Sequence, residues 1–120
     1  MVADDDPAVL DVLRLILEEG GYAVEAHADG ATLHAFPHGY PDLLLLDIWM
    51  SGWDGGQLCR ALKSRDETRH LPILLCSANR DGERIAREAG ADGFIAKPFD
   101  MDTLLRTIAR HLASRPAPRC

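Results

Sequence analysis

Residues 41–47 read Pro-Asp-Leu-Leu-Leu-Leu-Asp, and no other segment restricts the possible folds as strongly. The four leucines form an apolar run that is too short for an ordinary helix and is bounded by the turn-forming pair Pro-Asp. A run of this kind predicts a strand, residues 43–46, that is buried on both faces of a sheet. Asp47 is then the first residue beyond the carboxyl end of this strand.

Short apolar runs and segments of helical period alternate on both sides of this strand. The pattern predicts five strands, at residues 2–3, 22–26, 43–46, 71–76 and 93–96. It also predicts helices from Pro7 to the Gly20-Gly21 pair, at 32–36, 57–64 and 81–89, and after Asp100, with a loop at 52–56. Alternating strands and helices predict a parallel sheet covered on both faces. Right-handed crossovers leave few topologies, the flavodoxin-like one among them.

The composition is that of a single globular domain. The chain has 120 residues, 47% of them apolar and 27% charged, so it is too short for two ordinary domains and too apolar for a disordered chain. Residues 1–113 are predicted to form the domain, and the proline-containing residues 114–120 a tail or the start of a linker. The three cysteines include no Cys-x-x-Cys pair, which disfavours a disulfide framework or a cysteine-rich zinc site.

The charge balance restricts the partners. Nineteen acidic residues against thirteen lysines and arginines give a net charge of −6, so we expect no affinity for nucleic acid or for an anionic membrane surface. No apolar run is long enough to span a membrane, and no basic segment precedes an apolar one near Met1. We therefore expect a cytoplasmic protein that has neither nucleic acid nor a membrane as a direct partner.

Polar side chains follow the predicted strands at their carboxyl ends, which is where ligands bind in open α/β sheets. Asp4, Asp5 and Asp6 follow the first strand, Asp47 the third, Ser77 the fourth and Lys97 the fifth. Clustered carboxylates repel one another unless a cation joins them, and an open site of oxygen ligands suits Mg²⁺. Together Mg²⁺ and Lys97 would balance the charges of Asp4, Asp5 and Asp47, which would allow a phosphoryl dianion to approach.

With these residues the chain resembles the receiver domain of two-component response regulators over residues 2–113. Four motifs carry the resemblance, and each alone is a modest signal. They occur in the family's order and with family-like spacing: Val-Ala-Asp-Asp-Asp-Pro (2–7), Pro-Asp-Leu-Leu-Leu-Leu-Asp-Ile-Trp-Met-Ser-Gly-Trp-Asp-Gly (41–55), Pro-Ile-Leu-Leu-Cys-Ser-Ala (72–78) and Gly-Ala-Asp-Gly-Phe-Ile-Ala-Lys-Pro-Phe (90–99). The resemblance implies an α/β fold with a flavodoxin-like, five-stranded parallel sheet of order 2-1-3-4-5.

The resemblance also implies a phosphoacceptor site. Asp47 would take a phosphoryl group from phosphohistidine on a histidine kinase or a histidine phosphotransfer protein. Asp5 would bind Mg²⁺ (or Mn²⁺) directly and Asp4 mainly through water, with the backbone carbonyl of Trp49 as a further ligand. Catalysis of such a transfer consists mostly of positioning and charge neutralisation, which agrees with the charges found at the strand ends.

Two further motif residues, Ser77 and Lys97, would bind phosphoryl oxygens, and the resemblance implies a cis peptide before Pro98. Phe94 takes the place of the family's switch aromatic residue. Phosphorylation would draw Ser77 inward, let Phe94 rotate and change the surface of the fourth helix, fifth strand and fifth helix. Partners or a second copy of the domain, in a homodimer, would bind this surface. The chain would be a signalling switch rather than a metabolic enzyme.

Three features depart from the family pattern. The first strand is shorter than usual, because only Met1 precedes Val2, and we therefore expect low stability. Ser51 stands where proline is usual, and Gly56 where an apolar residue is usual. None of these changes removes a chemical group from the site.

Other functions stay open on the residues alone. The main alternative is a receiver-fold interaction module that works without phosphorylation, although no acid, hydroxyl or lysine of the site is missing. A phosphohydrolase would need a second acid two residues after its nucleophile, where this chain has Trp49. A flavin phosphate would be repelled by the acids after the first strand. A zinc pair at His34 and His38 is disfavoured, because Pro37 interrupts the helix between them.

Overall fold

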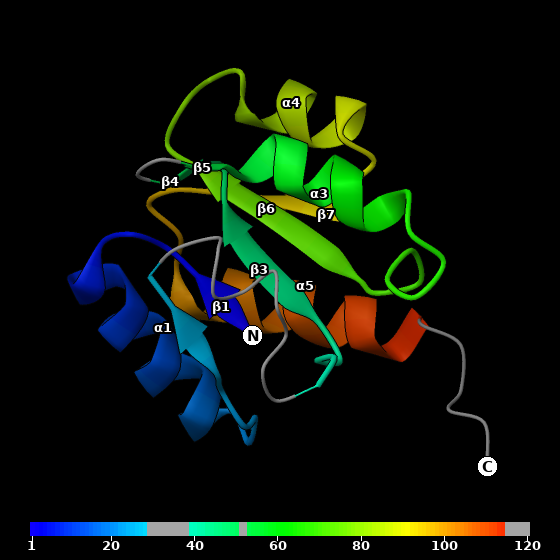
Figure 1. Ribbon diagram of the computed structural model, residues 1–120. Coiled ribbons are helices and arrows are strands. Elements are labelled where there is room, and N and C mark those ends of the chain that lie inside the picture. Colours follow the sequence, from blue (N-terminus) through cyan, green and yellow to red (C-terminus); the bar gives the residue numbers. More distant parts are fainter. Residues whose placement is uncertain (29–38, 51–52, 115–120) are drawn as a thin grey trace, which may run out of the picture.

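The computed structural model describes residues 1–28, 39–50 and 53–114. Its centre is a parallel sheet of five strands in the order β2-β1-β3-β6-β7 (Figure 1). The strands are β1 (Val2–Ala3), β2 (Ala26–His27), β3 (Leu44–Asp47), β6 (Ile73–Ser77) and β7 (Gly93–Ala96). Counted along the chain, the order of these five strands is 2-1-3-4-5, so the predicted flavodoxin-like topology is confirmed.

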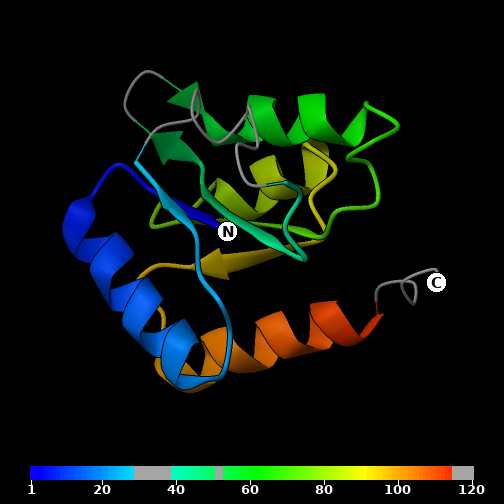
Figure 2. The ribbon, with the colours of Figure 1, turned by 60° about the horizontal axis from the view of Figure 1, so that its bottom comes forward.

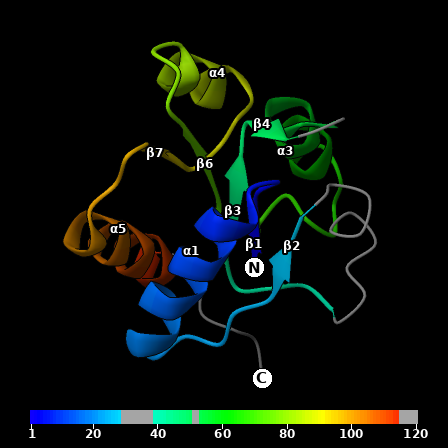
Figure 3. The same cartoon turned by 90° about the vertical axis from the view of Figure 1, so that its left-hand side faces the viewer.

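Helices cover both faces of this sheet. The described part of the chain contains α1 (Pro7–Glu19), α3 (Gly55–Lys63), α4 (Gly82–Glu88) and α5 (Met101–Ser114). Figures 2 and 3 show α1 and α5 against one face and α3 and α4 against the other. Because side chains alternate between the faces of a strand, Leu44 and Leu46 pack on the α3–α4 side and Leu45 on the α1–α5 side. The leucine run is therefore buried on both faces, as predicted.

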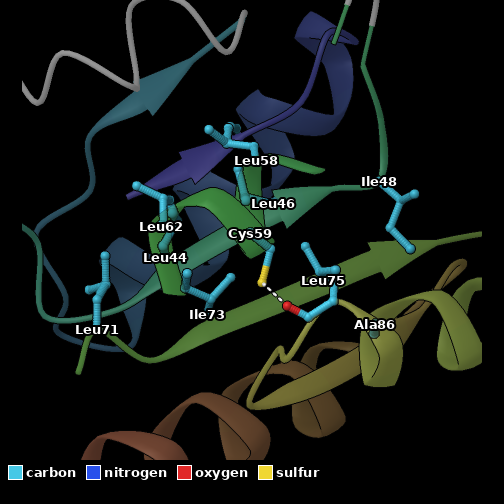
Figure 4. Close-up of a cluster of buried hydrophobic side chains, with 12 residues drawn as sticks. Leu44, Leu46, Ile48, Leu58, Cys59, Leu62, Leu71, Ile73, Leu75 and Ala86 are labelled. Carbon is cyan, nitrogen blue, oxygen red and sulfur yellow. Dashed lines mark hydrogen bonds between the residues drawn. The ribbon is translucent and has the colours of Figure 1, made fainter. Parts of the chain in front are cut away.

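The core on the α3–α4 side is shown in Figure 4. Leu58 and Leu62 of α3 pack there against β3 and β6, and the thiol of Cys59 donates a hydrogen bond of 3.7 Å to the carbonyl of Ala89. Cys76 lies in the core of the opposite face, where burial raises the pKa of its thiol to about 12. Both thiols are therefore protonated, packed core groups.

The starts of two helices follow directly from the sequence. The Asp6 side chain accepts a hydrogen bond of 2.9 Å from the N–H of Ala8, and Pro7 occupies the first helical position, where no N–H is needed. Asp100 caps α5 in the same way and accepts a hydrogen bond of 2.7 Å from the N–H of Thr103. Both helices begin where the sequence predicts them.

The second strand is shorter than predicted and shifted toward the carboxyl end. Only Ala26 and His27 pair with β1, opposite Val2 and Ala3. As an edge strand, β2 has β1 as its single neighbour in the sheet, and β1 has two residues. Before Ala26 the only backbone hydrogen bond described to β1 is that of 2.8 Å from the N–H of Val2 to the carbonyl of Glu25, because the short first strand offers residues 22–24 nothing to pair with.

The predicted loop at 52–56 is wrong from Trp53 onward. Trp53–Asp54 forms a short strand, β5, which pairs antiparallel with β4 (Trp49–Met50), and α3 already begins at Gly55. The reason is the side chain of Asp54, which accepts a hydrogen bond of 2.8 Å from the N–H of Gly56 and so caps a helix that begins with two glycines. The other predicted elements agree with the structure to within two residues at each end, which is the usual uncertainty of helix ends.

Two predictions fall outside the described residues. They are the helix at 32–36 and the histidine pair, His34 and His38. Within the ranges that the structure does describe, no helix combines the length and the apolar character that crossing a membrane requires.

Candidate functional site

The parallel order of the strands brings the predicted site residues to one edge of the sheet. Asp4 directly follows β1, Asp47 ends β3, Ser77 ends β6 and Lys97 directly follows β7. Because β3 lies between β1 and β6, Asp47 stands near the middle of this edge. The strand ends one residue later than predicted, so Asp47 is its last residue instead of the first one beyond it, and it pairs with Cys76 of β6.

Lys97 joins the two buried carboxylates of this edge. Its Nζ lies 2.6 Å from Oδ2 of Asp4 and 3.4 Å from Oδ1 of Asp47. Burial by itself lowers the pKa of the ammonium, but the hydrogen bond to Asp4 and the neighbouring acidic groups outweigh burial and raise the pKa. Lys97 is therefore a permanent cation at neutral pH. The peptide bond between Lys97 and Pro98 is cis, as implied by the motif.

The two buried carboxylates differ in how well they are compensated. Oδ1 of Asp4 accepts a hydrogen bond of 2.9 Å from the N–H of Asp6, and Oδ2 of Asp4 binds Lys97. Asp47 is less well compensated. Its pKa is raised, first by burial and then by the charges of Asp4 and Asp5, and Lys97 offsets only part of this. The edge therefore carries more negative charge than its single ammonium balances.

Asp5 completes a group of three carboxylates that could hold a metal ion. One carboxylate oxygen from each of Asp4, Asp5 and Asp47 lies within 4.8 Å of the others, and Asp5 is exposed while the other two are buried. A partly open set of oxygen ligands suits a small, hard cation that keeps several waters, such as Mg²⁺. The raised pKa of Asp47 marks the excess charge that such a cation would neutralise, so the residues fit the ion.

Ser77 and Phe94 meet beside this edge at the start of α4. Ser77 is buried, and its Oγ accepts a hydrogen bond of 3.0 Å from the N–H of Asn79, which leaves the hydroxyl proton available to a phosphoryl oxygen. A Cβ atom at Gly82 would lie 2.7 Å from two ring atoms of Phe94 and 3.1 Å from Cβ of Ser77. The absence of a side chain at Gly82 therefore makes room for the ring, and a movement of Ser77 would bear directly on both neighbours.

Trp49 lies at the rim of the edge, two residues beyond Asp47. It belongs to β4, pairs with Asp54 across the hairpin, and is 52% exposed. An indole of this exposure is largely in solvent and is not part of the core.

Comparison with known proteins agrees with this geometry. The family model described as the response regulator receiver domain matches residues 1–109. The chain belongs to this family. The transcriptional regulatory protein CseB of Streptomyces avermitilis is similar in sequence: it is 36% identical over 98% of this chain and 52% of its own length. The response regulator MprA of Mycobacterium avium is 42% identical over 98% of this chain and 52% of its own length.

A solved receiver domain has the same architecture. The crystal structure of the receiver domain of NtrX from Brucella abortus superposes with a TM-score of 0.84 at 30% identity and covers 94% of this chain and 97% of that one. The chain spans about half the length of these two curated relatives. The similarity therefore assigns a receiver domain, and the activities of the full-length relatives belong to those proteins.

Three residues that support the receiver site were not predicted. Asp54 and Gly55 connect the hairpin to α3, and Gly82 accommodates the ring of Phe94. A signal for Asp54 was present in the sequence, because an aspartate that precedes a helical pattern is a typical N-cap. No local signal exists for Gly82, because its role depends on a strand that follows eleven residues later.

Proposed function

We propose that this receiver domain is a phosphoacceptor switch in which Asp47 takes a phosphoryl group from phosphohistidine on a histidine kinase or a histidine phosphotransfer protein. The observation that carries the proposal is the position of Lys97, whose ammonium lies against both Asp4 and Asp47 at the carboxyl edge of the sheet. A lysine in this position neutralises the charge that otherwise keeps a phosphoryl dianion away from a carboxylate.

The transfer is a displacement at phosphorus. An oxygen of the Asp47 carboxylate forms a bond to phosphorus, the phosphorus–nitrogen bond of phosphohistidine breaks, and its electron pair returns to the imidazole nitrogen. Lys97 and Ser77 bind phosphoryl oxygens, the first through its ammonium and the second through its hydroxyl proton. Ser77 is buried, at 3% exposure, and the Lys97 side chain is partly buried, at 19% exposure, and is bound to Asp4, so both groups are held in place before the reaction.

Asp4, Asp5 and Asp47 would hold Mg²⁺ (or Mn²⁺), together with the backbone carbonyl of Trp49. When bound, the ion supplies charge neutralisation and orients the phosphoryl oxygens. The chain's own contribution is the pairing of Asp4 with Lys97 and the N–H of Asp6, which fixes the carboxylate at the edge. The raised pKa of Asp47 supports the proposal, because it marks a carboxylate whose ionised form gains from an added cation.

The output of the switch would be the surface formed by α4, β7 and α5. Ser77 ends β6, and Phe94 belongs to β7. The Cβ atom of Ser77 and the ring of Phe94 both lie next to Gly82 at the start of α4. Movement of Ser77 toward the phosphoryl group would change the space that the ring occupies next to Gly82, and with it the start of α4. A partner, or a second copy of the domain in a homodimer, would bind this surface differently before and after phosphorylation.

The outer side of α1 supports a docking place for the phosphoryl donor. Val12 and Leu15 are spaced three residues apart, so they lie on one side of the helix, and they are 50% and 61% exposed. The helix begins at Pro7, directly after the acidic residues of the site. A helix that carries phosphohistidine could therefore cover this apolar pair while its imidazole reaches Asp47.

We propose further that residues 1–113 form the receiver unit and residues 114–120 a tail or linker, although α5 itself continues through Ser114. Because ATP supplies the phosphohistidine of a kinase inside the cell, we also propose a cytoplasmic location. The net charge of −6 supports a domain that does not itself bind nucleic acid or a membrane.

Intact-mass measurement after incubation with acetyl phosphate tests the proposal. We expect one phosphoryl group per chain with Mg²⁺ or Mn²⁺, none after chelation, and none in Asp47→Asn. Asp66→Asn is the matched control, because it removes an exposed carboxylate from the connection between α3 and β6 and should leave the labelling unchanged. Label that persists in Asp47→Asn would overturn the assignment. A parent chain that takes no label under any condition would favour the unphosphorylated interaction module instead.

A further inference from the structure

Backbone hydrogen bonds fix Ile48, the residue before the proposed metal ligand Trp49, on both sides. The N–H of Ile48 donates a hydrogen bond of 3.0 Å to the carbonyl of Cys76 in β6. The carbonyl of Ile48 accepts a hydrogen bond of 2.6 Å from the N–H of Gly55, the first residue of α3. The peptide that leads into Trp49 is therefore fixed between the central sheet and the start of a helix.

The register of the hairpin determines where the Trp49 carbonyl points. Residues opposite each other in an antiparallel pair alternate between hydrogen-bonded and non-hydrogen-bonded positions. Ile48 is bonded to Gly55, and Trp49 lies opposite Asp54 at the next position of the ladder, so Trp49 occupies a non-hydrogen-bonded position. Its N–H and C=O consequently point away from β5, which leaves the carbonyl outside the ladder and available to a ligand.

Asp54 links this hairpin to α3. Its backbone lies opposite Trp49, while its Oδ1 accepts hydrogen bonds from the N–H groups of Gly56 at 2.8 Å and of Gln57 at 3.2 Å. The helix that it caps is anchored in the core through Leu58 and Leu62. The Asp54 carboxylate thus ties the β4–β5 pair to a helix that is anchored in the core.

The close approach at Gly55 shows how tightly the two parts fit. A Cβ atom there would lie 2.2 Å from the carbonyl oxygen of Asp47 and 2.9 Å from Cα of Ile48. A loss of the cap that let α3 begin later would remove this contact and release the backbone on both sides of Trp49. The geometry of the metal ligands therefore depends on the start of α3.

From these contacts we infer that Asp54 is a positioning residue: by capping α3, it holds the 49–54 hairpin so that the Trp49 carbonyl can bind the divalent cation. The inference rests on the proposed function, because it assumes the metal site formed by Asp4, Asp5, Asp47 and Trp49. Asp54 itself touches neither the cation nor the phosphoryl group in this scheme.

Mg²⁺ affinity, measured without any phosphoryl donor by the fluorescence of the chain's own tryptophans, tests the inference. Asp54→Ala should weaken Mg²⁺ binding about fivefold, the factor that corresponds to the loss of a typical cap. Asp54→Asn should restore the affinity of the parent, because asparagine caps helices as well as aspartate does. Denaturation midpoints are measured for each variant, so that folding and affinity are read separately.

Asp100→Ala provides the matched control. Asp100 caps α5 through the N–H and the hydroxyl of Thr103, so its loss should lower the denaturation midpoint about as much while Mg²⁺ affinity stays within twofold of the parent. If Asp54→Ala binds Mg²⁺ as tightly as the parent, or if Asp100→Ala weakens binding equally, Asp54 has no positioning role and the proposed function is unaffected. A parent chain without a saturable Mg²⁺ response would overturn the metal site and the inference together.

Discussion

Two lysine–aspartate pairs lie at opposite ends of the strands of the same sheet. One lies where the strands begin, the amino edge, and the other where they end, the carboxyl edge, and the two pairs differ in function. At the amino edge, the ammonium of Lys63 donates to the carbonyls of Arg69 and Leu71, at 3.3 and 2.8 Å, and to Oδ2 of Asp92 at 2.7 Å. Asp92 also accepts a hydrogen bond of 2.8 Å from the N–H of Ile73, which fixes the start of β6. At the carboxyl edge, Lys97 faces two carboxylates, and a third lies nearby.

The difference lies in charge balance. One ammonium and one carboxylate compensate each other at the amino edge, and the surplus donors of Lys63 are used by backbone carbonyls. At the carboxyl edge the carboxylates outnumber the ammonium, and the pKa of Asp47 is raised. The balanced pair at the amino edge has a structural role. The carboxylate excess at the carboxyl edge instead makes a site that gains from binding a cation or from reacting with an electrophile.

The largest expected effect comes from removing the ammonium at the carboxyl edge. Lys97→Met should slow labelling of Asp47 by acetyl phosphate by a factor of about 100 or more, because one preorganised charge that binds the transferred group is lost. The measurement is the rate of mass gain at saturating Mg²⁺. If Lys97→Met were labelled at the rate of the parent, the distinction between the two edges would fail.

The corresponding change at the amino edge should affect stability instead. Lys63→Met removes three hydrogen bonds of a charged donor, which should lower the free energy of unfolding by about 2 kcal/mol. The rate of labelling of the folded fraction should stay that of the parent. Urea denaturation and the labelling assay, run on the same preparations, separate the two effects. A slower labelling in Lys63→Met at unchanged stability would show that the amino edge is coupled to the site.

The amino edge also has a gap, which gives a third prediction. A cavity of about 430 Å³ is lined by Met1 and by residues that include Leu17, Tyr22, Val24, Tyr40, Leu43 and Leu112. The Met1 ammonium donates a hydrogen bond of 3.0 Å to the carbonyl of Leu43, at the place of a strand N–H. Adding Lys-Val-Val before Met1 should place one valine in the cavity and raise the free energy of unfolding by about 1.5 kcal/mol.

The Met1 ammonium adds a pH dependence to this prediction. Burial lowers its pKa below the ordinary value of 8.0, although Glu25 and Asp42 act in the opposite direction. A base whose pKa is lower in the folded state binds fewer protons there, so the parent should become more stable as the pH rises between the lowered pKa and 8.0. Adding Lys-Gly-Gly is the control, since it removes this slope without filling the cavity. An unchanged midpoint with Lys-Val-Val would mean that the short strand is already compensated.

Most of the fold could be predicted because its signals are local. The leucine run before Asp47 and the order of elements were sufficient for a parallel sheet covered on both faces, and the family resemblance then supplied its strand order. The bounds of β2 could not be predicted, because they depend on how many residues β1 offers for pairing. The residues of the carboxyl edge were predicted from strand ends, but their contacts were not, since a lysine 93 residues after Asp4 binds it only in the folded chain.

The start of α3 was mispredicted for a similar reason. Two successive glycines disfavour a helix by intrinsic preference, and residues 52–56 were therefore expected to be a loop. The close approach between Gly55 and the carbonyl of Asp47 reverses that preference, because only glycine fits there and the Asp54 cap supplies the missing stability. Tertiary contacts of this kind carry no local pattern in the sequence.

The smallest expected effect concerns Trp49 at the rim of the carboxyl edge. Hydrolysis of phosphorylated Asp47 needs a water in line with the bond to phosphorus. We expect the Trp49 indole, two residues beyond Asp47, to hinder that water, and an indole offers no acceptor that could orient it. Trp49→Asn should therefore speed loss of the phosphoryl group about tenfold, which corresponds to about 1.4 kcal/mol of barrier. The measurement is the decay of the phosphorylated mass after the donor has been removed.

Tyr40→Asn is the control for Trp49→Asn, because it replaces an aromatic residue of similar exposure, 56% against 52%, that lines the cavity of the amino edge. Its rate of decay should match that of the parent. If Trp49→Asn loses its phosphoryl group no faster than Tyr40→Asn, then the half-exposed indole lies against solvent without shielding the site. The lifetime of the phosphorylated state would then depend on other neighbours of Asp47, such as Lys97, which is unchanged in both variants.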